Sequence, residues 1–269
     1  MSAAFLTMEQ ASLQQGPREF GPFSMGIGVG ERVAILGPSG AGKSTLLKLM
    51  ARELKQASGQ IRLQQRHLHH WSLAELSQRR AVLPQSHEVA FGLPSELVIS
   101  LGRVSRVHDP ELDRIVAQAA ELACAHHLLG RCMDTLSGGE KARVQMARVF
   151  AQLWDVEGGL VLVDEPLAAL DPGLQLQLLD AMQAFARGRQ HAVVAVLHDV
   201  NHALQGFDRL LLVKEGALVG DLRSDVHALP HLEALYGVDF ARAEGPDGGV
   251  IVAPHRVREG ASHSARRAA

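Results

Sequence analysis

The chain has 269 residues, 46% of them hydrophobic and 21% charged, so it is long enough to bury a sizeable core and lacks the composition of a disordered protein. Lys and Arg total 27 against 29 for Asp and Glu, and the net charge of -2 gives no electrostatic reason to expect a nucleic-acid partner. The longest apolar runs, Leu160–Val163 and Ala192–Leu197, are far shorter than the roughly 20 residues of a membrane-spanning helix.

The N-terminal residues do not predict export. The first ten lack the basic start and the long apolar stretch of a secretory signal, so we expect the chain to remain in the cytoplasm.

Short apolar runs bounded by Gly or polar residues predict buried parallel strands. They are Arg32–Leu36, Leu160–Val163, Ala192–Leu197 and Arg209–Val213. Helical patterns such as Ser44–Leu54 and Leu174–Ala186 alternate with these strands. The alternation predicts an α/β fold in which helices cover both faces of a parallel sheet.

A phosphate-binding loop follows the first of these strands. The residues fit G-x-x-x-x-G-K-[ST], the Walker A pattern, and are Gly37, Pro38, Ser39, Gly40, Ala41, Gly42, Lys43, Ser44 and Thr45. The glycines let the backbone wrap closely around phosphate oxygens, and the following helix directs its free N–H groups toward them. Lys43 adds a cation and Ser44 can ligate magnesium. The motif therefore predicts binding of a nucleoside triphosphate.

The pattern changes to helices from about residue 86 to 150. Pro110–Ala125 and Gly138–Ala151 are helical patterns, and no strand run comparable to the others interrupts them. We expect residues 86–150 to form a helical subdomain inserted into an α/β core made of residues 1–85 and 151–240.

Two acids end the strand Leu160–Val163, as in a Walker B element. We expect Asp164, at the strand tip, to hold magnesium together with Ser44, and Glu165 to polarise the attacking water. Two acids after a strand are commonly just a polar turn. A phosphate site, however, needs a metal ligand from a neighbouring strand, which favours the catalytic interpretation.

The last segment, residues 241–269, is rich in Gly, Arg, His and Ala, and beyond Val252 it shows no convincing period. We expect a C-terminal segment that is mobile at its end.

A further motif opens the helix Gly138–Ala151. Leu136–Glu140 reads Leu-Ser-Gly-Gly-Glu, which also fits a helix-capping box. Behind a Walker A loop it resembles the signature motif of ABC ATPases, and Gln85, Asp171 and His198 resemble the Q-loop, D-loop and switch histidine of that family. The resemblance spans roughly residues 25–240 and implies a P-loop NTPase core of the RecA-like type with an inserted helical subdomain.

The resemblance also implies roles and ligands. It implies an ATP-hydrolysing subunit that uses ATP and Mg²⁺ and forms a head-to-tail dimer with a second copy of itself. Each ATP would lie between one copy's Walker A loop and the other copy's signature helix. The implied catalytic residues are Glu165, His198 and Gln85, the implied metal ligands are Ser44, Asp164 and Gln85, and the further nucleotide contacts are Ser137, Gly138, Gly139 and Asp171.

The expected partners follow from the same resemblance. They are transmembrane permease subunits and, indirectly, a substrate-binding protein, with the chain peripheral on the cytoplasmic side of the membrane. The permease is expected to contact the region Gln85–Leu101, where Ala90, Phe91 and Leu93 are apolar and can equally belong to the subdomain core.

The sequence departs from the family upstream of the Walker A loop. Members usually carry an aromatic residue there that stacks on adenine, but Leu13–Arg18 contains none, and Phe20 and Phe23 are the candidate substitutes. The usual Thr-Ser after the Walker B proline is Leu167-Ala168 here.

The cargo is indicated by lineage alone. The segments Arg80–Gln85 and Leu101–Arg103 resemble importers of iron chelates, heme and cobalamin, and Ala147–Trp154 and Val194–Asn201 look most like the hemin-importer ATPases. The resemblance implies hemin import, with ferric siderophore or cobalamin import as the alternative. A non-transport ABC ATPase fits less well, because the chain has one Walker A loop, compact Walker spacing and no basic surplus. A P-loop kinase fits less well, because it would need an acceptor pocket and has no use for the signature helix.

Overall fold

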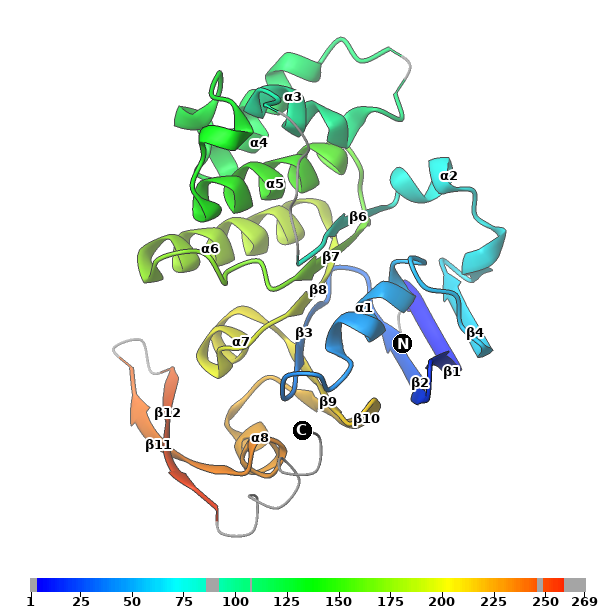
Figure 1. Ribbon diagram of the computed structural model, residues 1–269, viewed down its shortest axis with the longest axis vertical. Helices are drawn as coiled ribbons and strands as arrows, with labels where there is room; N and C mark the ends of the chain where they lie inside the picture. Colours follow the sequence, from blue (N-terminus) through cyan, green and yellow to red (C-terminus); the bar gives the residue numbers. More distant parts are fainter. Residues whose placement is uncertain (1–3, 86–91, 107, 246–248, 259–269) are drawn as a thin grey trace.

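The structure is a computed structural model that describes residues 4–85, 92–106, 108–245 and 249–258 (Figure 1). Ala90 and Phe91, two of the expected permease contacts, lie outside the described residues.

A six-stranded sheet forms the centre of the molecule, in the order β10-β9-β3-β8-β7-β6. Neighbouring strands from β9 to β6 run parallel, and β10 pairs antiparallel with β9 at one edge. The strands are β3 (Arg32–Leu36), β6 (Arg80–Leu83), β7 (Leu160–Asp164), β8 (Ala192–Val196), β9 (Arg209–Lys214) and β10 (Ala217–Arg223). The predicted α/β fold is confirmed.

The two faces of this sheet belong to two separate hydrophobic cores, as the alternation of side chains along a strand requires. Ala34 and Leu36 of β3 join one core, together with α5 (Gly138–Gln152), α6 (Pro172–Arg189) and α7 (Val200–Gly206). Val33 and Ile35 join the other, together with α1 (Lys43–Met50). Because β3 is covered on both sides, the loop that follows it is held by a rigid support.

A second sheet, which the sequence analysis did not predict, covers the α1 side. Its order is β2-β1-β4-β5, and the strands are β1 (Leu6–Gln15), β2 (Arg18–Ile27), β4 (Ser58–Leu63) and β5 (Arg66–His67). The register of β1 shifts between Met8 and Leu13 against β2, so its buried residues do not alternate regularly. This irregularity hides the strand from a search for period-two patterns.

The described residues between β6 and β7 include the α-helices α3 (Ser95–Ser100), α4 (Leu112–Leu122) and α5. They gather at one end of the molecule, at the top of Figure 1. Arg103, almost fully buried, pairs there with Asp109 and also with Asp155, at 3.2 Å, which joins the segment after α3 to the end of α5. The short helix α2 (Leu73–Ser77) precedes β6.

The C-terminal part is more ordered than expected. Helix α8 (Leu229–Tyr236) leads into a hairpin of β11 (Val238–Glu244) and β12 (Val250–Val257), so regular structure continues past Val252, where the sequence shows no convincing period. Strand β12 is held by Asn201 of α7, whose side-chain amide exchanges two hydrogen bonds, of 2.8 and 3.0 Å, with the backbone of Val252. Residues 259–269 lie outside the described residues.

The helices in the described part of the chain include none that combines the length and apolar character needed to cross a bilayer.

Candidate nucleotide-binding site

The loop between β3 and α1 is built on glycines that no other residue can replace. Gly42 has a φ of 104°, and a Cβ on it would lie 2.8 Å from the Phe20 ring. A Cβ on Gly37 would lie 2.1 Å from the carbonyl oxygen of Val213 in β9. Both glycines therefore allow an approach of neighbouring atoms that a side chain would block.

Lys43 opens α1 and is 6% exposed. Its Nζ donates to the carbonyl oxygens of Gly37, at 2.8 Å, and Pro38, at 3.1 Å. Burial lowers the pKa of Lys43, whereas the nearby carboxylates of Glu165 and Asp164 act to raise it. The ammonium is thus held inside its own loop, beside two acids.

The loop borders a cavity of about 350 Å³. The cavity collects predicted residues from four separate parts of the chain, together with two residues of β2. Its lining consists of Arg18, Phe20, Ser39, Gly40, Ala41, Gly42, Lys43, Ser44, Thr45, Gln85, Glu165 and His198.

Asp164 lies beside this cavity at the end of β7 and is 2% exposed. Burial raises the pKa of its carboxyl, and a hydrogen bond with the Ser44 side chain lowers it in part. Among the residues that the structure describes, none supplies a hydrogen-bond partner to Oδ1 of Asp164. A buried carboxylate oxygen without a donor, next to a hydroxyl, fits the all-oxygen coordination that Mg²⁺ prefers.

Glu165 and His198 meet at the edge of the same cavity. His198 Nε2 lies 2.6 Å from Glu165 Oε1. Glu165 has a φ of 53°, which is uncommon for a residue with a side chain, and its backbone N–H donates to the carbonyl of Val196 at 3.2 Å. This backbone turn directs the carboxylate of Glu165 to the cavity, whereas the preceding Asp164 stays buried.

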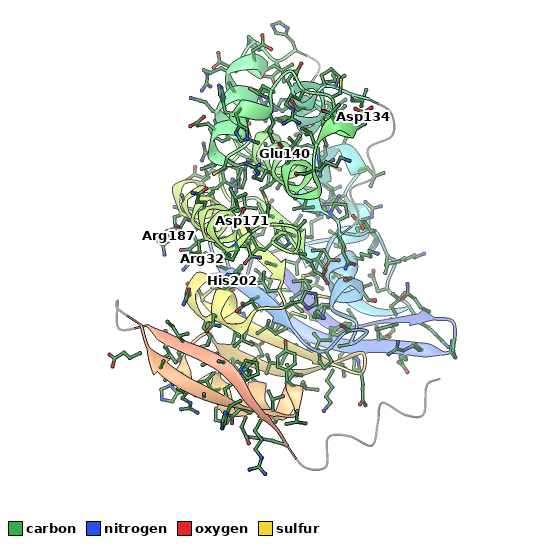
Figure 2. All side chains as sticks on the ribbon, turned by 60° about the vertical axis from the view of Figure 1, so that its left-hand side comes forward. Arg32, Asp134, Glu140, Asp171, Arg187 and His202 are labelled. Carbon is green, nitrogen blue, oxygen red and sulfur yellow. The ribbon has the colours of Figure 1, made fainter. Side chains whose placement is uncertain are left out.

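The predicted signature residues lie elsewhere in the same copy. Ser137, Gly138, Gly139 and Asp171 are absent from the cavity lining. Gly37 and Pro38 of the loop are absent from it too, and their carbonyl oxygens accept from Lys43. Ser137 caps α5 in a capping box with Glu140, whose pKa falls to about 2 because it accepts from the backbone N–H of Ser137. Asp171 caps α6, and Figure 2 labels it next to Glu140 on the neighbouring helix.

These two helix starts are packed closely against each other. A Cβ on Gly139 would lie 2.7 Å from the carbonyl oxygen of Ala169, whereas one on Gly138 would lie 3.8 Å from the nearest side-chain atom. Ser137 and Gly138 remain exposed, so the free N–H groups at the start of α5 face outward.

The two aromatic candidates upstream of the loop differ in their position relative to the cavity. Phe20 lines the cavity, whereas Phe23 is fully buried in the core under the second sheet. Arg18, which the sequence analysis did not single out, lines the cavity as well and donates to the carbonyl oxygen of Gly40 at 3.2 Å.

Tyr236 is a second residue that sequence reasoning missed. Its hydroxyl accepts a hydrogen bond of 3.2 Å from the backbone N–H of Gly37, 199 residues earlier in the chain. Burial raises the pKa of Tyr236 to about 12. No sequence signal connects these two positions, because the contact depends on how α8 packs against β9, the strand that pairs with β3.

A glycine-rich loop between the buried strand β3 and a helix, with acids at the end of β7, which β8 separates from β3 in the same sheet, defines a P-loop nucleotide-binding protein. Residues 20–168 match the family model described as ABC transporter. The chain belongs to the ABC transporter family and is an ATP-binding subunit of the importer type; ATP hydrolysis coupled to transport is the activity of that family.

Relatives and solved structures agree with this assignment. The chain is 41% identical to the hemin import ATP-binding protein HmuV of Pseudomonas aeruginosa, over 91% of this chain and 97% of the relative. It is 39% identical to the protein of that name from Pseudomonas entomophila, over 94% and 96%. A metal-chelate type ABC transporter in an inward-facing conformation superposes with a TM-score of 0.78 at 21% identity, over 96% of this chain and 99% of the other, and so confirms the fold.

Proposed function

We propose that this subunit hydrolyses ATP to drive the import of hemin, or a related iron chelate, through a separate membrane permease. The convergence of Lys43, Glu165 and His198 on one cavity carries the catalytic part of the proposal. The cargo is supported by 41% identity to a hemin import subunit along nearly its whole length. Import of a ferric siderophore or of cobalamin remains the alternative cargo.

The roles of the residues follow from their positions. Among the described residues that line the cavity, Glu165 is the only carboxylate, so it is the group that can orient a water and accept its proton. His198, at 2.6 Å, holds that carboxylate in place and presents its ring to the terminal phosphate. Lys43 leaves its two carbonyl partners to contact phosphate oxygens, because an anionic ligand is the stronger acceptor.

Magnesium completes the proposed site. When bound, Mg²⁺ supplies positive charge to the phosphate oxygens. Asp164 and Ser44 are the residues that would hold it, and Gln85, which lines the same cavity, is the third proposed ligand.

The exposed start of α5 supports a dimer. Ser137 and Gly138 are exposed, and the N–H of Gly138, the first residue of α5, has no acceptor within the helix, yet neither residue lines the cavity of its own copy. We propose that they complete the phosphate site of a second copy, because a helix N-terminus with small residues binds anions. Asp171 and Gly139, at the adjoining helix starts, would lie at the same interface.

We propose residues 86–150 as the subdomain that receives the permease. Leu97, Leu101 and Val104 are 45%, 45% and 78% exposed and follow one another at helical spacing along α3 and the turn after it. Leu93, in contrast, packs against the core. The exposed stripe is the apolar surface that a permease segment would cover, and it would hold the subunit at the cytoplasmic face of the membrane.

The test compares uptake of labelled hemin, ferric siderophore and cobalamin in cells whose only copy is wild type or Glu165→Gln. Glu157→Gln, a change of the same kind on an exposed loop residue, is the matched control. Loss of hemin uptake in Glu165→Gln alone would support the proposal. Loss of siderophore or cobalamin uptake instead would assign that cargo in place of hemin. Uptake of all three at the wild-type rate would refute the importer function.

A further inference from the structure

Different residues form the two sides of the cavity. On one side Glu165 and His198 lie together, with His198 Nε2 2.6 Å from Glu165 Oε1. Phe20 instead lies against Gly42, and Arg18 bonds to Gly40. A nucleotide whose terminal phosphate lies near Glu165 must therefore extend its base past the side formed by β2.

On that side, Phe20 offers little surface. It is 5% exposed and its ring edge is covered by the loop at Gly42. The Arg18 side chain is exposed and lies above Phe20, with the guanidinium carbon 5.6 Å from the ring centroid. A ligand that approaches from the cavity meets the guanidinium before it meets the ring.

We propose that Arg18 is the platform for the nucleotide base. Its planar guanidinium stacks on one face of the base, with Phe20 beneath it and the Gly40 carbonyl holding its edge at 3.2 Å. Arginine suits this role because its delocalised cation is planar and weakly hydrated, so it stacks on π-systems as an ammonium cannot. The inference rests on the proposed ATP site and adds the residue that recognises the base.

A platform of this kind has a predictable specificity. It contacts the face of the base and not its hydrogen-bonding edge, so adenine and guanine are held almost equally. Pyrimidine rings offer less area and are held more weakly.

The competing role for Arg18 is a phosphate contact. A phosphate contact depends on charge and is kept in part by lysine, whereas stacking depends on a flat π-surface and is kept by tyrosine. Inorganic tripolyphosphate distinguishes the two further, because it carries the phosphates without a base.

The experiment measures equilibrium binding of Mg-ATP, by calorimetry, to the full chain and to Arg18→Ala, Arg18→Lys and Arg18→Tyr, and competition by tripolyphosphate against each. We expect Arg18→Ala and Arg18→Lys to bind ATP about two- to fivefold more weakly, the range of a cation–π contact at an exposed site. Arg18→Tyr retains the wild-type affinity for ATP, and the inhibition constant of tripolyphosphate is the same in all four proteins. Arg62→Ala, in β4 of the same sheet and outside the cavity lining, is the matched control.

The opposite pattern would overturn the inference. In that pattern Arg18→Lys binds ATP as tightly as wild type, Arg18→Tyr binds it as weakly as Arg18→Ala, and tripolyphosphate competes more weakly in the variants that bind ATP weakly. ATP affinity that is equal in all variants would overturn it too. Because binding is measured apart from hydrolysis, a chain that shows the expected pattern but does not turn over ATP would refute the proposed function and leave the role of Arg18 intact.

Discussion

Replacing Tyr236 by Phe removes one oxygen and tests whether the C-terminal helix helps to hold the Walker A loop. The hydroxyl is the acceptor for the backbone N–H of Gly37, a buried residue at the end of β3. Leaving a buried N–H without an acceptor costs about 1 to 3 kcal/mol. In a chain of this size each kcal/mol lowers the melting temperature by about 2 to 4 °C, so we expect a loss of several degrees.

The kinetic effect follows from the same bond. The carbonyl of Gly37 accepts from Lys43, so a looser Gly37 lets the loop leave the geometry that binds phosphate. A restraint weakened by about 1 kcal/mol lowers the population of the competent loop up to about fivefold, and the KM for ATP rises by the same factor while kcat is retained.

Steady-state ATPase assays and thermal unfolding of Tyr236→Phe check both parts. Ser224→Ala is the matched control, because it also removes one hydroxyl, which donates to the carbonyl of Ala203 at 2.9 Å away from the loop. If Tyr236→Phe melts lower but keeps the KM of the control, the hydroxyl supports the fold and not the loop, and the reasoning is wrong.

Three further predictions concern packing, pH and metal. Gly139→Ala should reduce ATPase activity and stability, because its Cβ would lie 2.7 Å from the Ala169 carbonyl oxygen. The Cβ of Gly138→Ala would lie 3.8 Å from its nearest neighbour, so this variant should leave the stability of the isolated chain unchanged. Melting curves and ATPase rates of the two variants test this difference. Burial lowers the pKa of His191 from 6.5 to about 4, so between those pH values only the unfolded chain takes up this proton. The free energy of unfolding should therefore fall by about 2 kcal/mol from neutral pH to pH 5. His191→Gln should flatten this pH dependence, which chemical unfolding measures. EDTA should abolish hydrolysis, and Asp164→Asn should raise the Mg²⁺ concentration needed to restore it; an unchanged Mg²⁺ requirement would remove Asp164 from the metal site.

The sequence predicts those parts of the site whose chemistry needs consecutive residues. The Walker A loop is such a part, because one backbone segment must wrap around the phosphates, and the structure places it between β3 and α1. The end of β7 is another, since Asp164 is buried beside the cavity and Glu165, the next residue, lines it. Helix α1 ends at Met50 and not at Leu54, because Arg52 adopts a left-handed backbone with a φ of 56°.

The parts that sequence reasoning missed depend on contacts between distant segments. Strand β1 carries register shifts that break its alternation, and so its sheet was not predicted. The strands β11 and β12 bury only Val252 among their residues, so they show no alternation of buried and exposed positions. The anchor of the hairpin is the amide of Asn201, about 50 residues earlier.

These missed segments all reach the nucleotide cavity or residues next to it. Strand β2 brings Arg18 and Phe20 to the loop, α8 brings Tyr236 to Gly37, and Asn201, three residues after His198, ties the hairpin to α7. The motif residues supply groups for the reaction, but their positions are set by elements without any motif. Arg18→Ala in β2 and Tyr236→Phe in α8 should therefore both weaken ATP binding although they leave every motif residue in place.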